Sequence, residues 1–207
     1  MGGKRDLNRR QRTQALLDAA LPLFVEQGVE PVTIDAIAKS AGVAKGSFYR
    51  YFRDKEQLVE ALVQPAADAV VSAFEDCRDA LNRTPDPAAL GNAYAALALA
   101  LTELVLTRPL LARLYLLESR GAPRGARAPL VQLAQAVAAG AVELTRRGQE
   151  LGLLRPLEPR VNALAVVGAV ERLLTAHLDG DLEDLEATAL GADLIELVLD
   201  GVRPRAS

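Results

Sequence analysis

The chain has 207 residues, a length that fits one large domain or two unequal ones. Half of the residues are hydrophobic, so the chain can bury a core and does not have the composition of a disordered protein. The single cysteine excludes an intramolecular disulfide, and one cysteine with one histidine argues against a Cys/His zinc site within one chain.

The charge is distributed unevenly along the chain. Residues 1–57 carry ten Lys or Arg and seven Asp or Glu, a net charge of +3, whereas residues 58–207 carry 14 and 20, a net charge of −6. All four lysines lie within the first 55 residues, and four of the eight aromatic residues lie within residues 48–52. This asymmetry predicts a small, specialised N-terminal module on a larger body.

The first elements are predicted to be a basic arm and a helix. Residues 1–8 are polar and are expected to form a flexible arm. Apolar residues then recur at helical spacing over 9–27, and Gly28 is a typical C-terminal stop. Pro22 lies inside this helix and removes one backbone donor, so a kink is expected there.

Two short helices are expected next, over residues 34–41 and 45–52. Thr33 is a good N-cap for the first of them. Gly42 supplies the tight turn between the two, which requires a residue that tolerates positive φ. This arrangement is typical of a helix-turn-helix unit.

The rest of the chain is predicted to be helical. Asp54 is placed to cap a helix that starts near Lys55, and Pro65 either kinks that helix or divides it in two. Further helices are expected over 88–107, 109–119, 128–151, 158–178 and 182–202. Because Ala and Leu dominate and no segment alternates as a strand does, we predict an all-α protein of about nine helices.

The aromatic cluster divides into two faces of the second short helix. Phe48 and Phe52 are four residues apart and are expected to point into the core. Tyr49 and Tyr51 lie off that face, and Lys45 lies at the start of the same helix. An outward face of basic and tyrosine side chains is what a recognition helix presents to a major groove.

The stretch from Arg9 to Leu62 resembles the TetR family of transcriptional regulators. The resemblance rests on the ordered set LLDAALPLFVEQG, TIDAIAKSAGV, KGSFYRYF and DKEQL at these spacings. It implies a three-helix DNA-binding domain over residues 9–55 and a larger helical bundle for ligand binding and dimerisation over residues 56–207. It therefore implies a ligand-responsive regulator, and repression is the commoner behaviour in the family.

The resemblance also implies which residues contact the bases of double-stranded DNA. Lys45, Ser47 and Tyr49 occupy positions that resemble the base-contacting ones, and Gly46 would let the backbone approach the duplex. Asp35 departs from the pattern, because some members have a basic residue there. An Asp either caps the helix or accepts a hydrogen bond from a cytosine, so no contact is assigned to it.

A second set resembles the positions that contact the DNA backbone. Arg50, Tyr51 and Lys55 resemble the phosphate contacts of the family, and Thr33 would lie near a phosphate. Arg12 belongs to the basic N-terminal segment that would follow the backbone or probe the minor groove.

The larger domain is expected to hold an apolar or aromatic effector. The candidate residues lie on the helices that would surround a cavity: Phe74, Cys77, Tyr94, Ala98, Thr102, Glu103, Tyr115 and Glu118. The alternative for each of them is ordinary core packing with the charged groups outside. Cys77 is otherwise a small core residue, and His177 is expected to be satisfied by packing or by a helix C-terminus.

The remaining expectations concern partners and compartment. A homodimer that reads a palindromic operator is expected, with 158–178 and 182–202 as the interface; the small residues of 158–178 fit a core equally well. No metal, cofactor, enzyme activity or membrane partner is expected, and the resemblance implies the bacterial cytoplasm. The competing hypothesis is an all-helical adaptor that binds protein without reading DNA.

Overall fold

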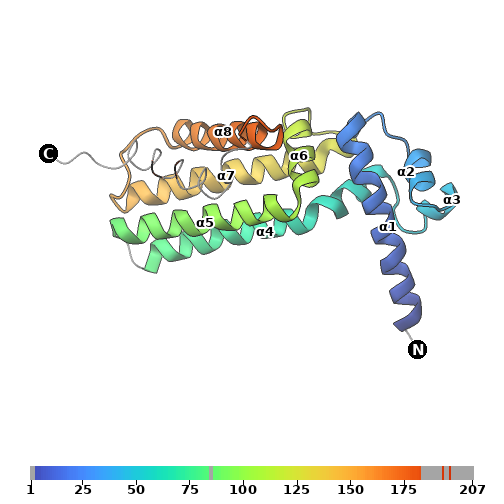
Figure 1. Cartoon of the computed structure of the whole chain (residues 1–207). Helices are drawn as coiled ribbons and strands as arrows, with labels where there is room; N and C mark the ends of the chain where they lie inside the picture. Colours follow the sequence, from blue (N-terminus) through green and yellow to red (C-terminus); the bar gives the residue numbers. More distant parts are fainter. Residues whose placement is uncertain (1–2, 84–85, 183–192, 194–195, 197–207) are drawn as a thin grey trace. The chain divides into compact units, whose positions relative to one another are not determined.

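The structure is a computed structural model that describes residues 3–83, 86–182, 193 and 196. Within these residues it contains eight α-helices, one short 3₁₀ helix and no strand, so the predicted all-α class is confirmed (Figure 1). The elements are α1 (Gly3–Gln27), α2 (Ile34–Ser40), α3 (Lys45–Phe48), α4 (Lys55–Arg83), α5 (Pro87–Thr107), α6 (Pro109–Glu118), η1 (Gly125–Arg127), α7 (Ala128–Glu150) and α8 (Pro159–Leu178). The expected helix over 182–202 falls almost entirely outside the described residues.

The contacts divide the chain into two compact units. The first consists of residues 1–65 together with 110–134, and the second of residues 66–109 together with 135–207. The first unit therefore holds α1, α2 and α3, and also α6, η1 and the beginning of α7. The sequence led us to expect residues 110–134 in the C-terminal domain alone.

The first helix differs from its prediction at its beginning. It starts at Gly3, so the described residues from 3 to 8 are helical where a flexible arm was expected. It also continues through Pro22, because Leu16, Ala20 and Phe24 on its inner face are fully buried and their packing outweighs one missing hydrogen bond. In the same way α4 continues through Pro65, so the alternative of two separate helices is wrong.

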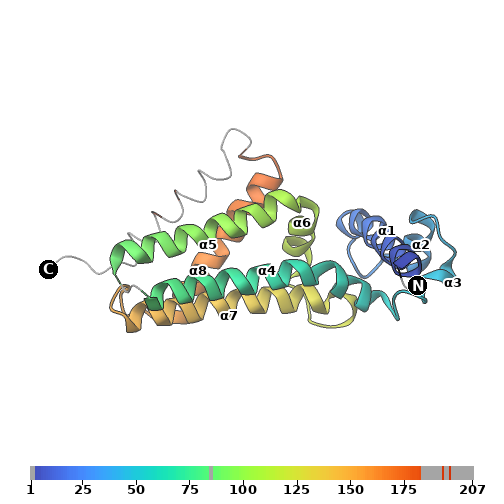
Figure 2. The ribbon, with the colours of Figure 1, turned by 90° about the horizontal axis from the view of Figure 1, so that it is seen from below.

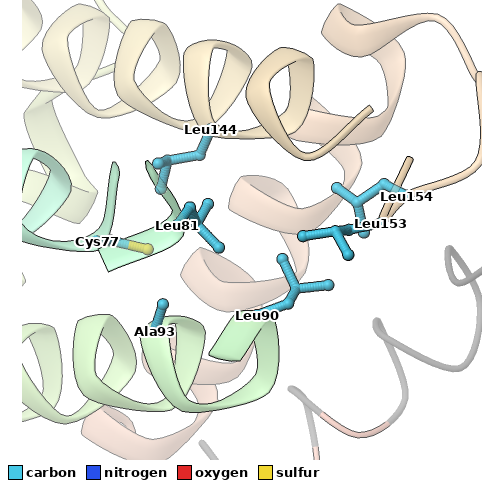
Figure 3. Close-up of a cluster of buried hydrophobic side chains, with 7 residues drawn as sticks. All are labelled: Cys77, Leu81, Leu90, Ala93, Leu144, Leu153 and Leu154. Atoms are coloured by element: carbon cyan, nitrogen blue, oxygen red, sulfur yellow. The ribbon is translucent and has the colours of Figure 1, made fainter. Parts of the chain in front are cut away.

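The second unit contains a compact apolar core (Figure 3). Its buried members come from α4, α5, α7 and the turn after α7: Cys77, Leu81, Leu90, Ala93, Leu144, Leu153 and Leu154. Figure 2 shows α4 and α7 running alongside each other. Their close packing depends on Gly140 of α7. A Cβ atom on Gly140 would lie 2.7 Å from the ring of Phe74, so only glycine leaves room for that ring.

Long apolar stretches of the second unit remain exposed in the single chain. Among the residues that the structure describes, three helical segments are long and apolar enough to cross a membrane by length and composition alone: Pro87–Thr107, Gly125–Glu150 and Pro159–Leu178. Only 11% of the most apolar window is buried in the first and in the last of them. The exposed side chains include Leu99 and Leu106 on α5, and Val161 and Leu164 on α8. Burying such surface is favourable, so these helices are suited to a further partner.

Candidate nucleic-acid interface

The helix-turn-helix begins with a capped α2. The Thr33 hydroxyl accepts a hydrogen bond from the Ala36 N–H at 3.1 Å, as predicted for an N-cap. On the inner face of this helix Ile37 and Ala38 are buried. Helix α2 contacts both α1 and α3, which fixes its position within the first unit.

The turn between α2 and α3 depends on glycine. Gly42 has φ +67°, and no heavy atom outside its own neighbourhood lies within 4 Å of its Cβ position. The Gly42 N–H donates to the Lys39 carbonyl at 3.1 Å, and the Val43 N–H donates to the Ala38 carbonyl at 2.9 Å. The turn is therefore closed by backbone bonds that a residue with a side chain could form only under strain.

The aromatic cluster is divided as predicted. Phe48 is completely buried and Phe52 is 4% exposed, and their ring centroids lie 5.7 Å apart. Tyr49 is 55% exposed, although its ring meets Phe48 edge-on at 5.6 Å. Phe48 and Phe52 thus anchor the segment while Tyr49 stands on its outer surface.

The outer surface of α3 carries positive charge and little bulk at its start. Lys45, Gly46 and Arg50 are exposed, and Ser47 is half-buried. Helix α3 has only four residues. Beyond it the chain forms a turn, in which the Tyr51 N–H donates to the Phe48 carbonyl at 2.9 Å. This is shorter than the predicted 45–52, because the chain turns here toward α4 instead of completing a second helical turn.

An ion pair joins the starts of α2 and α3. The Lys45 ammonium lies 4.0 Å from the Asp35 carboxylate, and both side chains are more than half exposed. Water screens such a pair and makes it weak, so a phosphate or a base can displace it. The sequence showed that Asp35 departs from the family pattern but not that it faces Lys45.

Lys55 does not have the surroundings expected of a phosphate contact. Its ammonium donates three hydrogen bonds, at 2.7, 2.7 and 2.9 Å, to the carbonyl oxygens of Val29, Glu30 and Val32. Burial lowers the pKa of Lys55, and the negative charges of Glu30 and Glu118 oppose that shift. All three protons of the ammonium are thus donated to the loop between α1 and α2, and in this arrangement none is left for a phosphate.

Asp54 caps α4 beside it. Its Oδ1 accepts from the Gln57 N–H at 2.8 Å, and the Gln57 side chain accepts from the Arg53 N–H at 2.6 Å. This reciprocal pair is close to a capping box and confirms the predicted cap. The remaining DNA-contact candidates are Arg12, which is exposed on α1, and Tyr51, which is half-buried after α3.

Three effector candidates are part of the core of the second unit. Cys77 is buried, and Phe74 and Tyr94 pack against the same cluster. Burial raises the pKa of the Cys77 thiol to about 12 and also raises the pKa of Tyr94, so both groups are neutral at pH 7. Phe74, Cys77 and Tyr94 thus lie in ordinary core packing, which was the alternative to an effector site.

The other candidates are divided between the two units. On α5, Ala98 and Thr102 are half-buried and Glu103 is exposed. Tyr115 and Glu118 lie on α6, in the first unit. Glu118 is buried and its carboxylate accepts hydrogen bonds from the Val29 N–H and the Arg127 guanidinium, so its oxygens are not free for an effector.

The N-terminal part of the chain matches known transcriptional regulators in sequence. Residues 16–62 match the model of the bacterial regulatory proteins, tetR family. An HTH-type transcriptional regulator of Staphylococcus aureus strain USA300 is 33% identical over 70 residues, which is 34% of this chain and 38% of that protein. The corresponding regulator of strain NCTC 8325 matches equally well. The chain thus spans well under half the length of these curated relatives.

Solved structures match over nearly the whole chain. The fatty acid degradation regulator FadR of Bacillus halodurans has a TM-score of 0.70 and 24% identity, over 92% of this chain and 99% of that one. FadR of Bacillus subtilis, solved with stearoyl-CoA, has a TM-score of 0.70 and 21% identity over the same shares. The ketosteroid transcriptional regulator of Mycobacterium tuberculosis has a TM-score of 0.61 and 23% identity, over 94% and 96%. These structures share the fold of this chain.

Proposed function

We propose that this chain is a TetR-family transcriptional regulator that binds DNA in a sequence-specific way, because residues 16–62 match the model of the bacterial regulatory proteins, tetR family, and an HTH-type transcriptional regulator is 33% identical over 70 residues. The observation that carries the proposal is the exposed surface of α2 and α3, anchored from behind by the buried Phe48. The proposed base contacts are Lys45, Ser47 and Tyr49, with Gly46 leaving room for the duplex. An all-helical adaptor has no need for a tyrosine-bearing basic surface of this kind.

The proposed contacts to the DNA backbone are fewer than the sequence suggested. Thr33, Arg50 and Arg12 are exposed and are proposed to reach phosphates, as is Tyr51, which is half-buried and follows Arg50 in the sequence. Lys55 is left out, because its ammonium is already satisfied.

The test of DNA binding is selection of an operator from random duplexes, followed by affinity measurements in a salt series. Replacing Tyr49 with Ala should weaken binding to the selected operator by at least tenfold. The matched control is Arg146→Gln, because Arg146 is an exposed basic residue of the second unit that pairs with Glu143. Failure to select any sequence, or affinity that does not depend on salt, would contradict the proposal.

We infer that the regulator acts as a homodimer on a palindromic site, as two recognition segments are needed to read enough bases. Helix α8 is the described element best suited to the interface, because Val161 and Leu164 are 67% and 56% exposed and Gly168 has open space at its Cβ position. Leu164→Glu should lower the molar mass measured by light scattering to that of a monomer. Leu99→Glu on α5 is the matched control, and dissociation by that variant alone would place the interface on α5 instead.

For the effector we propose an apolar small molecule that releases the repressor from its operator. The apolar stretches of α5 and α8 support this class of ligand, as does the stearoyl-CoA bound to one structural relative. Acyl-CoAs of increasing chain length and sterols should raise the melting temperature of the chain and lower its operator affinity. A compound that binds without changing operator affinity would refute the release mechanism. Such a regulator would act in the bacterial cytoplasm.

A further inference from the structure

The loop between α1 and α2 is held from two directions within the first unit. From the start of α4, the Lys55 ammonium binds three of its carbonyl oxygens. From the end of α6, Glu118 binds the N–H of Val29 at 2.8 Å across 89 residues of sequence. The loop leads directly into Thr33 and α2, so its position sets where the helix-turn-helix begins.

Glu118 is unusual among carboxylates because its side chain is only 7% exposed. One carboxylate oxygen accepts from the Val29 N–H and the other accepts from the Nε–H of Arg127, which lies in η1. Burying a charge is costly unless it is paired and hydrogen-bonded. Here both conditions are met, so the ionised group is a stable link between α6, η1 and the loop.

The neighbouring glycines leave room for this link. Gly28 has φ +83°, and a Cβ there would lie 3.1 Å from the Glu118 Oε1 atom. A Cβ on Gly121 would lie 2.5 Å from the Arg127 Cδ atom. Side chains at these two positions would press on the carboxylate and on its guanidinium partner. The local sequence is therefore adapted to the link at both ends.

We propose that Glu118 is a positioning residue for the helix-turn-helix: it ties the end of α6 and η1 to the loop that carries α2, and so couples the α6–α7 segment to DNA affinity. This inference rests on the proposed DNA-binding function. Displacing α6 separates Glu118 from Val29 and frees the loop from one of its two restraints, and displacing η1 removes the Arg127 partner that holds the carboxylate in place. A change in the α6–α7 segment then reaches the helix-turn-helix without passing through the α4 contact of Lys55.

The test uses the full chain with Glu118→Gln, which keeps the size of the side chain but removes its charge. Amide hydrogen exchange of residues 28–33, operator affinity and thermal midpoint are measured together. We expect exchange in this loop to become at least tenfold faster and operator affinity to fall by five- to tenfold. The salt dependence of binding should not change, because Glu118 contacts no phosphate. Glu143→Gln, which removes an exposed carboxylate paired with Arg146, is the matched control and should leave all three readouts unchanged.

Two further variants keep the proposal falsifiable if Glu118→Gln does not fold. Arg127→Lys retains a positive partner and should keep operator affinity within twofold, whereas Arg127→Gln should reproduce the loss. Gly28→Ala strains the same contact without changing any charge and should also speed exchange in the loop.

Loop exchange that does not change, or operator affinity within twofold of the parent in a folded Glu118→Gln chain, overturns the proposal. If the parent chain selects no operator, the proposed function fails, and hydrogen exchange alone decides this inference. Faster exchange extending from the loop into residues 34–48 then supports the coupling. Exchange confined to residues 119–127 overturns it.

Discussion

Two lysines that look equivalent in the sequence should affect different properties of the protein when each is replaced by methionine. Lys55 donates three hydrogen bonds to the loop between α1 and α2, whereas Lys45 is exposed and makes only a 4.0 Å ion pair. Lys55→Met should therefore lower stability, and with it the operator affinity that depends on the position of the loop. Lys45→Met should lower DNA affinity at unchanged stability, so it is the stability control for Lys55→Met.

The magnitude for Lys55 follows from its hydrogen bonds. A hydrogen bond to a charged group contributes about 1.5–3 kcal/mol net. The side chain is only half-buried and water can replace the bond to the exposed Glu30 carbonyl, so we count the equivalent of one or two bonds, about 2–4 kcal/mol in total. With a urea dependence of about 2 kcal/mol per molar, the unfolding midpoint should fall by about 1–2 M.

The magnitude for Lys45 follows from its exposure. Loss of an exposed ion pair costs about 1 kcal/mol or less, so the urea midpoint should hardly move. Loss of a base contact costs about 1–3 kcal/mol of operator affinity, and loss of a phosphate contact reduces the salt slope by about 1. Urea unfolding followed by circular dichroism, and operator titrations from 50 to 200 mM salt, measure both quantities.

A Lys55→Met chain with an unchanged urea midpoint would contradict the structural role of Lys55, because the three hydrogen bonds would then contribute nothing. Such a chain could in addition lose operator affinity with a smaller salt slope. That outcome would restore Lys55 to the phosphate contacts that the sequence indicated.

Three other substitutions test the local architecture. Phe48→Ala should cost about 3–5 kcal/mol, because its ring is fully buried; an unchanged urea midpoint would contradict this. Gly42→Ala should cost about 1–2 kcal/mol, since φ +67° is strained for alanine. Asp54→Ala should cost about 1 kcal/mol at pH 7 through the lost N-cap. Hydrogen bonds from Gln57 and Arg53 lower the pKa of Asp54, so its stabilisation is present above the usual value near 3.8 and is lost as pH falls below it. The cost of Asp54→Ala should therefore shrink as pH falls below about 3.8 in acid titrations of unfolding.

Local features of the helix-turn-helix could be predicted from the sequence because they depend on neighbouring residues. The Thr33 and Asp54 caps, the positive φ of Gly42 and the inward direction of Phe48 all follow from spacings of one to four residues. Helix ends were less predictable, because they depend on which side chains find packing. The continuation of α1 through Pro22 and the shortness of α3 are the two examples.

The sequence alone predicts the helical class, the helix-turn-helix and the division of its aromatic residues into an anchor and an outer surface. The hydrogen-bond partners of Lys55 and Glu118 emerge only in the tertiary structure. Lys55 reaches carbonyl oxygens 23 to 26 residues away, and Glu118 reaches an N–H 89 residues away. No local pattern signals such contacts, because a charged side chain looks the same in the sequence whether it meets solvent, a phosphate or a distant backbone group. The physical difference is the desolvation that folding imposes, and it exists only once the loop, α4 and α6 have come together.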